Sequence, residues 1–125
     1  MYLADHQSED RSIFSSEIAA QEKIPKKFLE TILRELRNFK LLQSQRGKTG
    51  GYRLIKDPKD IFLAELIRQV DGPIAMLPCV SLNYYSSCDE CDEAHCQIKS
   101  VFEKVRDKTL KILTTTSIET MRSKI

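Results

Sequence analysis

The sequence predicts a mainly α-helical fold that carries one small β-hairpin and ends in a long helix. Apolar residues recur at helical spacing in four segments between residues 15 and 114. A glycine-containing segment, RGKTGG, separates two short runs in which apolar and polar residues alternate. The chain has 125 residues, about the length of one domain, and its 4 Gly and 4 Pro are too few for a collagen-like or low-complexity chain.

A helix-turn-helix is expected near the N-terminus. Ser15 is a candidate N-cap for a short helix over residues 15–23, and Pro25 suits the first position of a longer helix. The apolar stripe of the longer helix consists of Phe28, Leu29, Ile32, Leu33 and Leu36. Two helices joined by so short a turn are typical of a helix-turn-helix.

A β-hairpin is expected next, over the segment LLQSQRGKTGGYRLI at residues 41–55. Its tip contains glycine because tight hairpin turns need positive φ angles, which cost little only at glycine. A hairpin that directly follows a helix-turn-helix has the organisation of a winged helix, in which the hairpin is the wing.

Two further helices are expected in the second half. Asp60 is a candidate cap for a helix that contains Ile61 and Val70, and Asp71-Gly72-Pro73 ends it. A loop leads from there to a helix over residues 97–114. The stripe of this last helix consists of Val101, Phe102, Val105, Thr109, Leu110, Ile112 and Leu113. Such a stripe predicts packing against a second copy of the chain, with packing inside one chain as the alternative.

The net charge of +2 conceals two regions of opposite sign. Residues 20–56 contain ten Lys and Arg against three Glu, whereas residues 79–96 contain four acidic residues and no Lys or Arg. The acidic residues are Asp89, Glu90, Asp92 and Glu93. They are interpreted as a solvated acidic loop whose charges raise the pKa of nearby thiols and so disfavour a thiol switch.

The basic region predicts binding to double-stranded DNA. The second helix of the helix-turn-helix would enter the major groove, with Lys26, Lys27 and Arg34 on its surface, and the wing would reach a phosphate or the minor groove. The wing tip consists of Arg46, Gly47, Lys48 and Thr49. The alternative for these charges is a solvated helix face without a partner.

The four cysteines follow the spacing Cys79-x8-Cys88-x2-Cys91-x4-Cys96, with His95 beside the last. Thiolates at these separations on a loop can converge on one metal centre. Three alternatives remain open from the residues alone. They are an iron–sulfur cluster, a tetrahedral zinc held by four Cys or by three Cys and His95, and a metal-free set of thiols.

The segment IPKKFLETILRELRNFKLLQSQRGKTGGYRL resembles the DNA-binding half of the IscR/NsrR/CymR group of bacterial winged-helix repressors, the Rrf-two family. The resemblance continues through KDPKDIFLAELIRQVDGP, the cysteine loop and TSIETM. It implies that the recognition helix opens with Pro25, Lys26, Lys27, Phe28, Glu30 and Thr31. It also implies that Arg46 enters the minor groove and that Glu30 helps to select the operator, although an intrahelical pair with Arg34 is the alternative for Glu30.

For the cysteine loop the resemblance favours a 2Fe–2S or 4Fe–4S cluster over zinc or no metal. Cys79 matches the first ligand of the family and Cys96 the third, while Cys88 and Cys91 compete for the middle place. The additional cysteine leaves open whether the cluster has four sulfur ligands or three. Some members carry a histidine three residues after the last cysteine, where this chain has Lys99. If only three cysteines bind the cluster, His95 or an acidic residue would have to replace it as fourth ligand.

These observations predict three parts: a winged helix-turn-helix over residues 1–72, a cysteine-bearing sensor loop over 73–96, and a dimerisation helix with a tail over 97–125. The first helix is expected to be cut to about one turn, because family members usually begin before a motif like MYLA.

The expected function is that of a cytoplasmic, dimeric transcription repressor that binds an operator and senses redox, iron–sulfur or nitrosative status. No catalytic residues, membrane partner or small-molecule substrate are expected. The alternative is a winged-helix adaptor for a partner protein, with structural zinc or metal-free cysteines.

Overall fold

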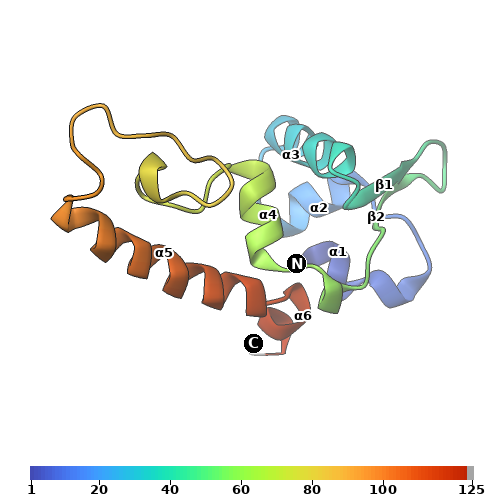
Figure 1. Ribbon diagram of the computed structural model, residues 1–125. Coiled ribbons are helices and arrows are strands. Elements are labelled where there is room, and N and C mark those ends of the chain that lie inside the picture. The colour runs from blue at the N-terminus through green and yellow to red at the C-terminus, as the bar shows by residue number, and fades with distance from the viewer. Residues whose placement is uncertain (124–125) are drawn as a thin grey trace. The chain divides into compact units, whose positions relative to one another are not determined.

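The computed structural model describes residues 1–123 and confirms a mainly helical fold with one two-stranded hairpin (Figure 1). In chain order the elements are α1 (Tyr2–Asp5), η1 (Gln7–Glu9), α2 (Ser15–Glu22), α3 (Lys26–Asn38), β1 (Leu42–Gln45), β2 (Gly51–Leu54), η2 (Pro58–Asp60), α4 (Leu63–Val70), η3 (Pro78–Val80), α5 (Gln97–Thr115) and α6 (Ile118–Arg122). The chain forms two units. The winged unit comprises Met1–Ile61 and the segment from Ile118 onward, and the helical unit comprises Phe62–Ser117.

The helix-turn-helix of the winged unit is α2 followed by α3, as the sequence predicts. Lys23 ends α2 in the left-handed conformation, with φ at 54°, and the backbone N–H of Ile24 donates to the carbonyl of Ala19 at 3.1 Å. After this turn α3 packs against α2. The core that holds the two helices together consists of Ile13, Ile18, Leu29, Leu33 and Leu42, all of them buried.

The wing is an antiparallel hairpin in which Leu42 pairs with Leu54 and Gln45 with Gly51. It is fixed to the segment before α2 by a short bridge between Ile13 and Tyr52. Each of these two residues donates its backbone N–H to the carbonyl of the other, at 3.0 Å from Ile13 and 2.8 Å from Tyr52. The bridge therefore fixes the wing relative to the helix-turn-helix.

Two helix starts differ from the sequence prediction. Phe14 occupies the N-cap position of α2, and Ser15 is the first helical residue, with its hydroxyl donating to Oε1 of Glu30 at 3.3 Å. Pro25 occupies the N-cap position of α3, one residue before the predicted role. Helix α2 thus begins at the predicted cap itself and α3 one residue later than predicted, and such boundaries are not fixed by the sequence pattern alone.

The helix predicted from Asp60 begins later, at Leu63. Asp60 ends the short turn η2, which Asp57 caps by accepting the backbone N–H of Lys59 at 3.0 Å. Ile61 is extended and 2 % exposed, and its carbonyl accepts the backbone N–H of Ile118 at 2.9 Å. Ile61 thus belongs to the core of the winged unit rather than to the apolar stripe of α4.

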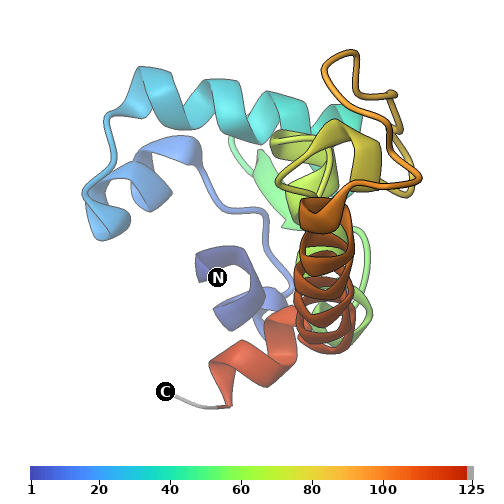
Figure 2. The same ribbon diagram turned by 60° about the vertical axis from the view of Figure 1, so that its left-hand side comes forward.

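The C-terminal segment returns to the winged unit, where α1 and α6 lie side by side (Figure 2). Nε of Arg122 lies 2.7 Å from a carboxylate oxygen of Asp5, and Ile118 is buried. Residues from α1 and α6, far apart in the sequence, therefore pack together in the winged unit. The predicted boundaries at residues 72 and 96 rest on the expected function of each part. The contacts between elements do not test function, so these boundaries stay a prediction.

In the helical unit, α4 packs against α5, and η3 packs against α5 as well. The side chain of Arg106 is 13 % exposed, and its guanidinium donates to the carbonyl of Val80 at 2.6 Å, which attaches the loop after α4 to the long helix. All 19 residues of α5 lie in the described part of the chain, and none is buried. No helix within residues 1–123 combines the length and the apolar character that a membrane span needs.

Candidate DNA-binding surface and cysteine loop

The first turn of α3 presents its side chains to solvent. Pro25, Lys26, Lys27 and Phe28 are all exposed, while Leu29 directly after them is buried in the core. Thr31 and Arg34 are exposed one and two turns further on. The structure therefore brings these predicted residues to one accessible helix, while Leu29 and Leu33 pack its other side into the core. Phe28, which the sequence pattern places in the apolar stripe, lies outside that core.

Glu30 is half-buried and already has partners within the winged unit. Its Oε1 accepts the hydroxyl of Ser15 at 3.3 Å and lies 3.8 Å from Nζ of Lys26. The intrahelical cation beside it is thus Lys26 rather than the Arg34 considered from the sequence. A base that uses this carboxylate as acceptor would have to compete with both contacts.

The wing tip is formed by Arg46, Gly47, Lys48 and Thr49, which are all exposed. Gly47 has φ at 103°, and the backbone N–H of Gly50 donates to its carbonyl at 3.0 Å, which closes the tip. Behind the tip, Arg37 of α3 donates to the hydroxyl of Ser44 in β1 at 3.4 Å. The basic residues of helix and wing consequently belong to one connected unit.

All four cysteines line one pocket of about 430 Å³ in the helical unit. The pocket is lined by Leu77, Pro78, Cys79, Ser86, Ser87, Cys88, Cys91, Cys96, Ile98 and Lys99. All four thiols are free, and Cys91 is the most accessible. Among the described residues, no group of three or more His, Cys, Asp or Glu side chains is placed to hold a metal ion as it stands.

The thiols influence one another. Hydrogen bonding with the Cys88 thiol, loss of hydration and the contact with Cys96 raise the pKa of Cys91 to about 12. At the start of α5 the backbone N–H groups of Lys99 and Ile98 lower the pKa of Cys96 instead. The pKa of Cys91 is thus raised, as the sequence predicts, although its largest causes are the neighbouring thiols and not the acidic side chains. For Cys96 the predicted direction is wrong, because its pKa is lowered.

Glu93 holds the cysteine loop together, a role that the sequence does not reveal. Its carboxylate accepts the backbone N–H of Cys88 at 2.8 Å, the hydroxyl of Tyr85 at 3.1 Å and the ammonium of Lys99 at 2.6 Å. The Lys99 ammonium is the main reason that the pKa of Glu93 is lowered. With a side chain only 18 % exposed, Glu93 is a structural residue and does not belong to a solvated acidic loop.

His95 is exposed and pairs with Asp92. Its side chain is 85 % exposed, and Nδ1 lies 2.6 Å from a carboxylate oxygen of Asp92. This contact with His95 lowers the pKa of Asp92. His95 does not line the cysteine pocket, whereas all four cysteines do.

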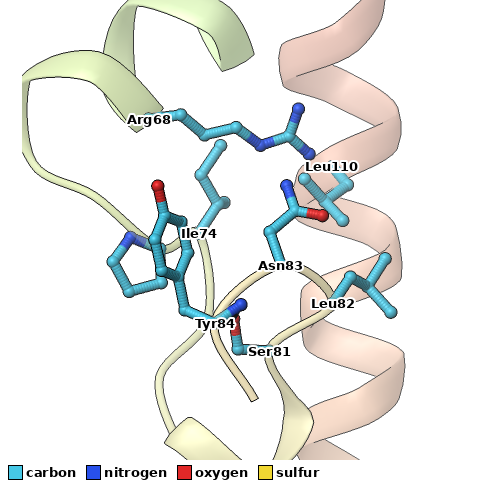
Figure 3. A pocket seen from close by; sticks show the side chains of 8 residues that line it. Arg68, Ile74, Ser81, Leu82, Asn83, Tyr84 and Leu110 are labelled. Atoms are coloured by element: carbon cyan, nitrogen blue, oxygen red, sulfur yellow. Dashed lines mark hydrogen bonds between the residues drawn. The ribbon is translucent and has the colours of Figure 1, made fainter.

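A second cavity of the helical unit lies between α4, α5 and the loop that contains Ser81 to Tyr84 (Figure 3). Arg68, Ile74 and Leu110 line it together with that loop. Its volume is about 10 Å³, which is the room that one water molecule needs. The cysteine pocket is therefore the larger of these two cavities.

The comparison with protein families decides the class. The family model for Rrf2, described as an iron-dependent transcriptional regulator, matches residues 1–124. The chain belongs to the Rrf2 family. The Rrf2 family comprises helix-turn-helix transcription regulators, a non-enzymatic class that binds DNA.

Individual Rrf2 relatives agree with this assignment. The chain is 43 % identical over 122 residues to the rrf2-like HTH-type transcriptional regulator of Rhodobacter capsulatus, covering 95 % of this chain and 81 % of the relative. CymR, the global cysteine regulator of B. subtilis, has a similar structure with a TM-score of 0.80 at 26 % identity, covering 99 % and 87 % of the two chains. IscR of T. potens gives a TM-score of 0.74 at 25 % identity, covering 98 % and 76 %.

Proposed function

We propose that this Rrf2-family regulator is a cytoplasmic, dimeric repressor that binds a palindromic operator and responds to the state of its cysteine loop. The observation that carries the DNA-binding part is the exposed first turn of α3 beside an exposed, basic wing in one unit. In a winged helix the recognition helix reads base edges, and the wing contacts the backbone or the minor groove. The residues proposed to contact DNA are Pro25, Lys26, Lys27, Phe28, Glu30, Thr31, Arg34, Arg46, Gly47, Lys48 and Thr49.

The DNA-binding proposal predicts a steep loss of affinity with salt. The Lys26→Ala/Arg46→Ala variant is expected to bind duplex DNA roughly tenfold more weakly and with a shallower salt dependence. Binding that neutralises fewer phosphates releases fewer counterions from the DNA, so the affinity depends less on salt. Fluorescence anisotropy titrations at several salt concentrations measure both quantities. The control variant Lys59→Ala/Lys104→Ala removes the same charge outside α3 and the wing. Equal affinities and salt slopes for both variants would contradict the proposed surface.

Dimerisation is proposed through α5. Ile98, Val101 and Ile112 are 60 %, 56 % and 64 % exposed, and they recur at a spacing that places them on one side of the helix. Apolar side chains so exposed on a 19-residue helix favour burial against a second copy. A two-fold dimer would double the contacts with DNA and match a palindromic operator, whose half-sites lie about 10 bp or a multiple apart.

The cysteine loop is proposed to hold an iron–sulfur cluster on Cys79, Cys88, Cys91 and Cys96. The donor set fits in kind and number, because four thiols line one pocket and His95 stands outside it. Lys99 occupies the position where some family members carry a histidine ligand, and its ammonium is held by Glu93 at 2.6 Å. The additional cysteine of this chain would therefore replace that ligand, once the thiols are deprotonated and converge further.

When bound, the cluster would supply a redox-sensitive iron centre. The protein's part is to transmit a rearrangement of the loop. Glu93 joins the backbone of Cys88 to Lys99 on α5, so a change at the thiols reaches the proposed dimerisation helix through one carboxylate. The spacing of the two recognition helices would change with the packing of α5.

The cluster proposal predicts a coloured protein after anaerobic purification, with iron and sulfide that depend on the thiols. Cys96→Ser is expected to lower bound iron roughly tenfold or more, because a hydroxyl is a poor ligand for iron–sulfur clusters. Iron and sulfide analysis with visible absorption spectra measures this. Ser87→Ala, which changes the same pocket without removing a thiol, serves as control. A colourless protein with one zinc per chain, or one with no metal, would contradict the cluster.

A further inference from the structure

We infer that Phe28 is a specificity-determining residue that contacts the 5-methyl group of thymine in the major groove. The inference rests on the proposed DNA-binding function and names one chemical feature of the operator. It concerns base readout alone and is independent of what the cysteine loop holds.

The ring of Phe28 lies in the first turn of α3 and is 62 % exposed. The neighbouring side chains of Leu29 and Leu33 are 5 % and 3 % exposed and form the core side of the same helix. Phe28 therefore does not contribute to the buried core, although large apolar side chains usually do so. Its position near the N-terminus of a recognition helix is where side chains reach base edges.

The polar groups around Phe28 offer little hydrogen-bonded readout of A·T pairs. Residues 25–32 contain no Asn or Gln, the side chains that pair with the edge of adenine. The hydroxyl of Thr31 donates to the carbonyl of Lys27 at 3.3 Å, within the helix itself. The carboxylate of Glu30 is engaged by Ser15 and Lys26.

An A·T pair can also be recognised from its thymine side, through the methyl group. A phenyl ring forms no conventional hydrogen bonds, so its favourable contacts in the groove are with apolar atoms. Thymine is the base that presents a methyl group there. The exposed ring of Phe28 would thus contact the methyl group, while Lys26 and Lys27 beside it would bind the phosphates and keep the helix in the groove.

The test removes single methyl groups from the DNA. An operator is first selected from random duplexes with the wild-type protein, and each thymine is then replaced in turn by deoxyuridine, which lacks only the 5-methyl group. For wild type, we expect one thymine per half-site whose replacement weakens binding about fourfold, as loss of one buried methyl group predicts. Phe28→Ala should bind the thymine and uracil duplexes equally, and Phe28→Leu should keep part of the difference.

Met76→Ala is the matched control, since it removes a side chain that is also apolar and exposed, at 72 %, but lies in the helical unit. It should keep the wild-type preference for thymine. The inference is wrong if no thymine is sensitive in wild type, or if Phe28→Ala still discriminates by the same factor. Failure to select any sequence would instead contradict the proposed DNA-binding function itself, and the inference with it.

Discussion

The Val101→Glu/Ile112→Glu variant is expected to be monomeric and to bind a palindromic operator about a hundredfold or more weakly than wild type. Both side chains are more than half exposed on α5, so their replacement leaves the helical unit intact. In a dimer, by contrast, two carboxylates per chain would be buried in an apolar contact without partners. Loss of the second chain removes the gain in affinity that comes from occupying both half-sites together.

Light scattering after size-exclusion chromatography gives the oligomeric state, and anisotropy with a two-site and a one-site duplex gives the affinity. The control is Ser100→Glu/Thr114→Glu, which introduces two carboxylates on α5 outside the line of Ile98, Val101 and Ile112. This variant should remain a dimer. Dimers of the first variant, or monomers of both, would show that the apolar side of α5 is not the interface.

The local parts of the fold could be predicted because their signals are local. The spacing from Phe28 to Leu36 sets α3, and RGKTGG sets the turn between β1 and β2. The start of α4 could not be placed in this way. Ile61 fits the helical period of the residues after it, yet its backbone pairs with Ile118, which lies 57 positions further along the chain. A tertiary contact of this kind overrides local spacing.

The same distinction between local signals and tertiary contacts applies to the candidate site. The exposed polar residues of α3 and the wing tip follow from helix and hairpin periodicity, whereas the exposure of Phe28 does not, because its spacing fits the apolar stripe. The shared pocket of the four cysteines agrees with their clustering in the sequence. The role of Glu93 could not be foreseen, because among four acidic residues in one short segment only the folded loop selects the one that meets Tyr85 and Lys99.

Gly51→Ala is expected to destabilise the winged unit by about 3 kcal/mol. A Cβ atom at this position would lie 2.4 Å from the carbonyl oxygen and 2.5 Å from the carbonyl carbon of Ile13. These are backbone atoms of a residue that is 2 % exposed and is held by two hydrogen bonds to Tyr52, so they cannot move aside cheaply. Gly51 also has φ at 124°, a conformation that alanine rarely adopts.

Urea denaturation followed by circular dichroism measures the loss as a lower midpoint. Gly47→Ala separates the two causes, because Gly47 has φ at 103° while a Cβ atom there would meet nothing within 4 Å. It should cost about 1 kcal/mol, the conformational part alone. Since Gly51 lies beside the bridge between Ile13 and Tyr52, its substitution should also loosen the wing and weaken binding to DNA. Equal destabilisation by the two substitutions would show that contact with the Ile13 backbone does not require glycine at position 51.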